Sequence, residues 1–206
     1  TEIGRKFLEY SAQSNLKRTV LECGGKNPCV VLEDAEALDE VARHAVYSVL
    51  WNMGQNCSSN SRLIVHAKVK DKLMERVVAR LRDWRTGYPL DPSNALGAII
   101  SKEQFDRIVR YIETGKKEGA SLVAGGEPLG DGPGLYIAPT VFDGVKPKMT
   151  IAREEIFGPV LSVITVNSTD EAVDVANDTS YGLQASLFTS NVRTAHRVAR
   201  ALQDRK

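Results

Sequence analysis

Apolar residues recur along this chain at two spacings, one typical of helices and one typical of strands. Apolar positions three or four residues apart predict helices over 1–15, 34–52, 69–84, 101–115 and 168–176, and a last helix after residue 191. Short apolar runs predict strands at 18–23, 29–33, 62–67, 121–124, 136–142, 159–166 and 183–189. Because strands alternate with helices, we predict an α/β fold with an open, parallel-type sheet flanked by helices.

Polar residues mark where several of these elements begin. Ser101 with Gln104, and Ser168 with Glu171, have the spacing of a capping box at the start of a helix. The Gly-rich segment 125–134 lacks a Lys-Ser/Thr pair and does not lie between a strand and a helix. We therefore interpret it as a surface loop and not as a phosphate-binding loop.

Composition and charge exclude several classes of partner. The chain has 206 residues, of which 42% are hydrophobic and 26% charged, as expected for one globular domain with a sizeable core. Its 27 basic and 26 acidic residues give a net charge of +1, so there is no overall field to attract nucleic acid or an anionic membrane. No apolar run approaches the roughly 18 residues of a membrane span. We expect neither nucleic acid nor membrane as a partner.

The three cysteines differ in their surroundings. An odd number of cysteines favours reduced thiols, which predicts the cytoplasm or another reducing compartment. Cys23 and Cys29 lie in apolar, strand-like runs, whereas Cys57 lies in a polar turn between a helix and a strand. Cys57 is therefore the candidate nucleophile. The three histidines share no ligand spacing, so no metal site is predicted, and His44, which lies off the apolar stripe of its helix, is expected to face solvent.

A carboxylate and two glycines precede the strand predicted at 29–33. Glu22 closes an apolar run, and Gly24 with Gly25 allows the backbone to turn. A thiol and a carboxylate, each at the end of a regular element, suggest a nucleophile and a base; the simpler interpretation of Glu22 is a surface acid. Lys26, next to the turn, is expected to be exposed.

Three motifs together resemble the aldehyde dehydrogenase family. They are Leu-Glu-x-Gly-Gly-Lys-Asn-Pro at 21–28, Gly-Gln-x-Cys at 54–57 and Glu-Glu-Ile-Phe-Gly-Pro-Val at 154–160. The resemblance runs through the chain but covers only the later part of a family enzyme, which implies a fragment. It implies that 1–22 is the residual end of a dinucleotide-binding domain. Residues 23–206 would then be the thiol-bearing catalytic domain, ending before its closing C-terminal strand.

The resemblance also implies a reaction and its residues. The thiolate of Cys57 would attack an aldehyde, NAD or NADP would accept hydride from the thiohemiacetal, and water activated by Glu22 would hydrolyse the thioester. A partly desolvated Glu22 with a raised pKa would suit that role. The N–H of Cys57 would be one oxyanion donor, the second being an asparagine of the preceding domain. Glu155, Phe157 and Gly24 would contact the cofactor.

The resemblance further implies a small-molecule aldehyde substrate and a parent enzyme that is a homo-oligomer, a dimer or tetramer. The sequence of residues 87–94 and 97–100 is similar to that of family members that oxidise amino- or guanidino-aldehydes. Alone, this fragment is expected neither to bind the cofactor nor to act as a dehydrogenase. Two alternatives remain open: a non-catalytic folded domain that only associates, and a thiol esterase or hydrolase. A hydrolase of the papain kind would need a histidine beside Cys57, and the sequence places none there.

Overall fold

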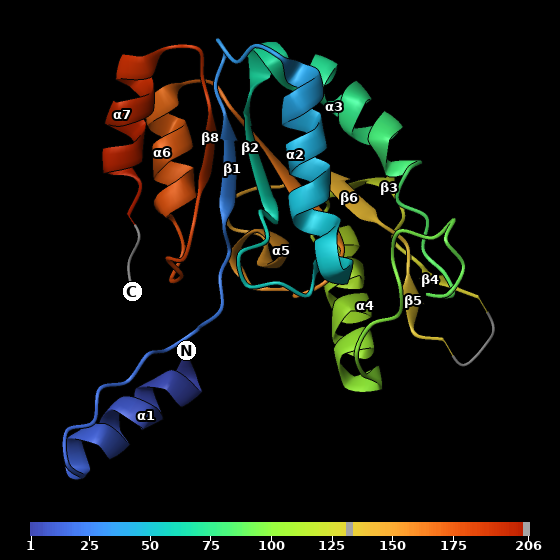
Figure 1. Ribbon diagram of the computed structural model, residues 1–206. Coiled ribbons are helices and arrows are strands. Elements are labelled where there is room, and N and C mark those ends of the chain that lie inside the picture. The colour runs from blue at the N-terminus through green and yellow to red at the C-terminus, as the bar shows by residue number, and fades with distance from the viewer. Residues whose placement is uncertain (131–133, 204–206) are drawn as a thin grey trace.

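The computed structural model describes residues 1–130 and 134–203, and its main sheet is covered by helices on both faces (Figure 1). The six strands lie in the order β3-β6-β7-β2-β1-β8 and are parallel, except that β3 at one edge runs antiparallel to β6. This arrangement confirms the predicted α/β class. The strands are β1 (Pro28–Val31), β2 (Arg62–His66), β3 (Ser121–Ala124), β6 (Thr140–Asp143), β7 (Val160–Val166) and β8 (Ser186–Phe188).

Alternate residues of the central strands belong to two separate cores. Val30 of β1 and Ile64 of β2 pack towards one layer of helices, whereas their neighbours Val31 and Val65 pack towards the other. All four side chains are fully buried, which explains why parallel strands appear in the sequence as unbroken apolar runs. The layer on the side of Val30 and Ile64 is α4 (Lys102–Lys117), α5 (Thr150–Arg153), α6 (Thr169–Asn177) and α7 (Val192–Ala201). The layer on the side of Val31 and Val65 is α2 (Leu38–Leu50) and α3 (Ala67–Leu81).

The N-terminal segment stands apart from this body. Helix α1 (Glu2–Gln13) forms as predicted, but none of its residues is buried, and it lies away from the sheet (Figure 1). The strand predicted at 18–23 is wrong: these residues are extended, but no described strand lies beside them to accept and donate the hydrogen bonds of a ladder.

Two further predictions are corrected in the segment 125–142. Within the predicted surface loop, β4 (Pro128–Leu129) pairs with β5 (Tyr136–Ile137), while residues 131–133 lie outside the described part. The predicted strand 136–142 is divided into β5 and β6. Pro139 lies between them, and a proline has no N–H to donate to a ladder.

In the described ranges, no helix combines the length and the hydropathy needed to cross a membrane.

The helix predicted over 34–52 ends at Leu50 and is followed by a tight turn, η1 (Trp51–Gly54). Asn52, Met53 and Gly54 all have positive φ, of 52°, 56° and 68°. A Cβ atom on Gly54 would lie 2.2 Å from the carbonyl oxygen of Gly158. Only glycine allows the backbone before Cys57 to come this close to the segment before β7.

We expect Gly54→Ala to destabilise the fold more than Gly119→Ala. Gly119 also has a positive φ, of 90°, but nothing lies within 4 Å of its added Cβ. Alanine there should cost about 1 kcal/mol of unfolding free energy, and at Gly54 about 2–4 kcal/mol, because two backbones must separate. Denaturant unfolding of both variants measures the difference. Equal losses would contradict the close approach of the two backbones.

Candidate active site

The three motifs meet at the amino ends of three neighbouring strands. The Gly-Gly turn leads into β1, the Cys57 loop into β2, and the segment 154–159 into β7. Since β2 lies between β1 and β7, and Arg62 is in register with both Pro28 and Ser162, the segments that precede the strands must lie side by side. The topology thus gathers residues that are about 100 positions apart in the sequence.

Close contacts join the Gly-Gly turn to both of its neighbours. The N–H of Gly25 donates to Oε1 of Glu155 at 3.0 Å. A Cβ on Gly24 would lie 2.2 Å from Oε2 of Glu155, and one on Gly25 would lie 2.5 Å from the carbonyl oxygen of Cys57. The two glycines therefore have no room for a side chain, and the structure brings Gly24, Cys57 and Glu155 together.

Helix α4 holds the segment that contains Glu155 and Phe157. The Nε2 of Gln104 donates to the carbonyl oxygens of Ile156 and Phe157, both at 2.9 Å, and Arg107 donates to that of Glu155 at 3.0 Å. The Oγ of Ser101 accepts from the N–H of Gln104, as the capping box predicted. The side chain of Gln104 does not complete the box, however, because it positions the segment instead.

Asn27 and Asn60 fix the loop that carries Cys57. The Nδ2 of Asn27 donates to the carbonyl oxygens of Cys57, at 2.7 Å, and Ser59, at 3.0 Å. The Nδ2 of Asn60 donates to that of Pro28 at 2.9 Å. Both asparagines are buried, and the sequence motifs gave no role to either side chain.

His44 belongs to this support and does not face solvent, so that prediction is wrong. Its Nε2 lies 3.2 Å from Oδ1 of Asn60 and 3.0 Å from Oγ of Ser186, and its ring packs edge-on against Phe188. Helix α2 turns this side of its surface towards β8. None of the hydrogen bonds among the described residues joins a histidine to Cys57, so the thiol–imidazole pair of a papain-type hydrolase is not seen there.

Two buried cations lie beneath the Gly-Gly turn. Lys26 is only 1% exposed, so the expectation of an exposed lysine is wrong. Burial, and then the charge of Arg62, lower the pKa of Lys26 to about 7, against the opposing effect of Glu155 and Glu154. Arg62 is equally buried, and burial lowers its pKa to about 10.

Arg62 satisfies its guanidinium with backbone carbonyls. Its Nε donates to the carbonyl of Lys26 at 2.8 Å, and its two terminal nitrogens donate to those of Val175 and Ala176 at 2.9 and 2.8 Å. The sequence offered a signal that motif reasoning missed. An arginine inside a fully buried strand must have partners, and here they are the Gly-Gly turn and the last turn of α6.

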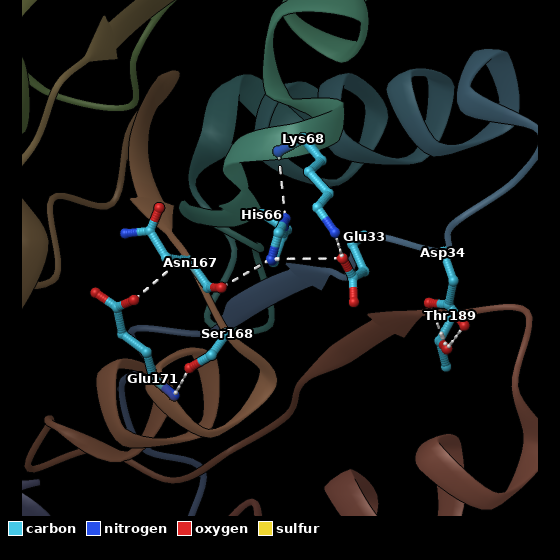
Figure 2. A network of polar contacts seen from close by, with 8 residues as sticks. All are labelled: Glu33, Asp34, His66, Lys68, Asn167, Ser168, Glu171 and Thr189. Atoms are coloured by element: carbon cyan, nitrogen blue, oxygen red, sulfur yellow. Dashed lines mark hydrogen bonds and ion pairs between the residues drawn. The ribbon is translucent and has the colours of Figure 1, made fainter.

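The opposite edge of the sheet is closed by polar groups that satisfy one another (Figure 2). The Nδ1 of His66 accepts the N–H of Lys68 at 3.2 Å, which leaves the proton on Nε2 to bond the carbonyl of Asn167 at 2.9 Å. Lys68 pairs with Glu33, and Glu171 accepts the N–H of Asn167 at 2.7 Å. Within 1–130 and 134–203, no cluster of three metal-binding side chains occurs here or elsewhere.

The predicted nucleophile and base differ in their surroundings. Cys57 is partly exposed, and none of the described backbone hydrogen bonds uses its N–H. Glu22 is exposed and makes no hydrogen bond or ion pair among the described contacts, so the expected partial desolvation is wrong for this chain. Cys23 is partly exposed like Cys57, whereas Cys29 is fully buried, and burial raises the pKa of Cys29 to about 12.

Comparison with known proteins decides the family. The sequence model described as the aldehyde dehydrogenase family matches residues 1–204. The chain belongs to the aldehyde dehydrogenase family. It is 51% identical over 203 residues to aminoacetaldehyde dehydrogenase of Pseudomonas aeruginosa, a match that covers 98% of this chain and 40% of that protein.

Solved aldehyde dehydrogenases have the same fold. The crystal structure of γ-glutamyl-γ-aminobutyraldehyde dehydrogenase from Burkholderia cenocepacia matches with a TM-score of 0.92 and 50% identity, over 98% of this chain and 41% of that one. The NAD+ complex of an aldehyde dehydrogenase from Bacillus cereus matches with a TM-score of 0.91 and 41% identity, over 97% of this chain and 40% of that one. The chain thus spans about 40% of the length of the relatives it matches.

We expect iodoacetamide at neutral pH to alkylate Cys57 of this aldehyde dehydrogenase chain before Cys23 and Cys29. Cys57 lies in a polar loop, whereas the buried Cys29 is almost entirely un-ionised. Mass spectrometry of peptides from the folded protein, taken at early times, gives the order. The same labelling in denaturant is the control and should remove the difference. Equal labelling of all three cysteines in the folded protein would refute Cys57 as the reactive thiol.

Proposed function

We propose that this chain is the thiol-bearing catalytic part of an NAD(P)+-dependent aldehyde dehydrogenase, which oxidises an aldehyde to a carboxylate. The observation that carries the proposal is the contact of the Gly-Gly turn with both Cys57 and Glu155 at one edge of the sheet. A nucleophile and a carboxylate suited to a ribose hydroxyl pair thus lie on either side of one turn.

A nucleophile must add to the aldehyde carbon before hydride can leave that carbon. The Cys57 thiolate adds to the aldehyde carbon, and the carbonyl oxygen becomes an alkoxide that the free N–H of Cys57 can stabilise. The nicotinamide cofactor, when bound, supplies the acceptor for the hydride that leaves the thiohemiacetal carbon. Glu22 then takes a proton from a water molecule as the water oxygen adds to the thioester carbon. The C–S bond breaks, the thiolate of Cys57 leaves, and the carboxylic acid product loses its proton to solvent.

The residues that would hold the cofactor fit a nicotinamide riboside. Glu155 presents a carboxylate anchored through Gly25, and Phe157, half-buried with φ of 57°, lies beside it. Because Gly24 and Gly25 have no side chains, the carboxylate of Glu155 and the backbone of Cys57 can lie close to the turn. We propose that Glu155 bonds the ribose hydroxyls, that Phe157 packs on the nicotinamide ring, and that Gly24 permits the approach.

Residues 1–22 fit the proposed role as the end of a dinucleotide-binding domain. Large apolar side chains of this segment face solvent, including Phe7, Leu16 and Val20, the last of them 86% exposed. Such a surface is expected to be covered by other parts of a protein. The same cover would take the carboxylate of Glu22 out of bulk water.

The substrate and setting are proposed in coarser terms. Aminoacetaldehyde dehydrogenase and γ-glutamyl-γ-aminobutyraldehyde dehydrogenase are among the relatives, which favours a nitrogen-bearing aldehyde as the substrate. Three free cysteines favour a reducing compartment such as the cytoplasm. We propose that the whole enzyme is a homo-oligomer, a dimer or tetramer.

In the full-length enzyme that contains this segment, Glu22→Gln should separate the two halves of the reaction. A glutamine cannot accept the proton of water, so steady turnover should fall by about 10²- to 10⁴-fold while Cys57 is still acylated. Rapid-quench measurement should show a first-turnover burst of reduced cofactor that survives the change. Cys57→Ser is the control that abolishes both phases. Loss of the burst together with turnover would show that Glu22 acts on the thiol or holds the loop.

The 206-residue chain alone should bind NAD+ with a dissociation constant above about 1 mM, or less than about 4 kcal/mol of binding free energy. In the described part, no Gly-rich turn joins a parallel strand to a helix, which is how a dinucleotide's phosphates are commonly held. Calorimetric titration tests this, with the Bacillus cereus enzyme as the positive control. Micromolar binding would refute the assignment of residues 1–22 and 23–206 to separate domains.

A further inference from the structure

A short series of hydrogen bonds leads from Gln184 to the backbone of Cys57. The Nε2 of Gln184, which lies just before β8, donates to the carbonyl oxygen of Ser58 at 2.8 Å. The N–H of Ser59 then donates to the carbonyl oxygen of Asn56 at 3.1 Å. The carbonyl of Asn56 shares a peptide group with the N–H of Cys57, and no described backbone hydrogen bond uses that N–H.

These bonds couple two rigid peptide planes. The carbonyl of Ser58 and the N–H of Ser59 belong to one trans peptide and point in opposite directions, as do the carbonyl of Asn56 and the N–H of Cys57. Holding one end of each plane fixes the direction of the other end. Each bond also polarises the next, strengthening it by about 10–30%, so the terminal N–H becomes a better donor.

Asn27 strengthens the same arrangement from the other side of the loop. Its Oδ1 accepts the backbone N–H of Gln184 at 3.2 Å, and its Nδ2 bonds the carbonyls of Cys57 and Ser59. The side chains of Asn27 and Gln184 together occupy three consecutive carbonyls, those of Cys57, Ser58 and Ser59. The backbone of the loop, and with it the N–H of Cys57, therefore has little freedom to reorient.

We propose that Gln184 is a positioning residue for the oxyanion site, which acts through the peptides of Ser59 and Cys57 to aim and polarise the Cys57 N–H. The inference rests on the proposed function, because it assumes that an oxyanion forms at Cys57. Gln184 has no contact with the reacting atoms and no role in the motifs that identify the family.

Two reactions of the same thiol distinguish this role from general support of the loop. Iodoacetamide forms a C–S bond as iodide leaves, and no oxyanion arises. With p-nitrophenyl acetate the thiolate adds to the carbonyl carbon, the π electrons move to oxygen, and the oxyanion collapses to expel nitrophenolate and leave an acetyl thioester. Only the second reaction needs the N–H of Cys57.

In the full-length enzyme, Gln184→Met should slow acylation of Cys57 by about 3- to 10-fold, because the donor to Ser58 is lost, and leave alkylation within about 2-fold. Gln184→Lys, which restores an N–H donor of similar reach, should recover most of the acylation rate. Gln203→Met, the same substitution at an exposed position after α7, should change neither rate. Stopped-flow release of nitrophenolate and mass spectrometry of the Cys57 peptide give the two rates.

Four outcomes would count against the proposal. Unchanged acylation in Gln184→Met would overturn it, as would a fall in alkylation by the same factor, which would mean that the loop itself had moved. Failure of Gln184→Lys to recover acylation would overturn the part of the inference that requires an N–H donor. If Cys57 of the unaltered enzyme is not acylated at all, the proposed function fails, and this inference fails with it.

Discussion

The buried guanidinium of Arg62 is the interaction on which the site depends most. It stands at the first position of β2 and bonds the carbonyl of Lys26 on one side and those of Val175 and Ala176 on the other. The last two belong to the final turn of α6, where carbonyls have no partner within the helix and carry partial negative charge. Hydrogen bonds to a charged group contribute about 1.5–3 kcal/mol each, so three of them offset the burial of the cation. The Gly-Gly turn is thereby fixed to the helical layer beneath it.

The order of the strands then determines which segments lie beside this anchor. Because β1, β2 and β7 are neighbours and parallel, the segments that enter them share one edge, and the residues of three distant motifs become adjacent. Open parallel sheets commonly bind ligands at the carboxyl ends of their strands. Here that edge is occupied by the network around His66 and Glu33, whose members bond one another (Figure 2). The candidate active site lies at the amino edge instead.

The sequence predicted those parts that depend on local pattern. Periodicity located the long helices and the central strands but not the short α5, and Ser168 caps α6 as its spacing indicated, with a bond of 3.1 Å. The side chain of Glu171 reaches back as expected, but it accepts the N–H of Asn167, at 2.7 Å, and not that of Ser168. It failed at 18–23, since an apolar run becomes a strand only if another strand lies beside it. It also failed for Lys26 and His44, because residue type predicts average exposure, whereas the burial of these two follows from how β1 and α2 pack.

Site residues divide in the same way. The motifs indicated Cys57, Gly24 and Glu155 as candidates, and the structure brings these three together. The motifs did not indicate Asn27, Gln104 and Gln184, whose amides bond the backbone of the same segments, since that depends on which carbonyl each amide reaches across the fold. A glutamine that completes such a bond has no periodicity or spacing to mark it in the sequence.

The anchoring of the Cys57 loop has a consequence for motion. Its supports, Asn27 and Asn60, stand at the entrances to β1 and β2, strands that are buried on both faces. The loop therefore belongs to the same cooperative unit as the core, and its bonded amides should exchange with deuterium at free energies close to that of global opening, whereas α1 frays independently. Under the proposed function, a loop held so firmly would not shift its backbone to suit different aldehydes. Differences in substrate would then arise in surface segments outside this unit, while the backbone of Cys57 stays where the sheet holds it.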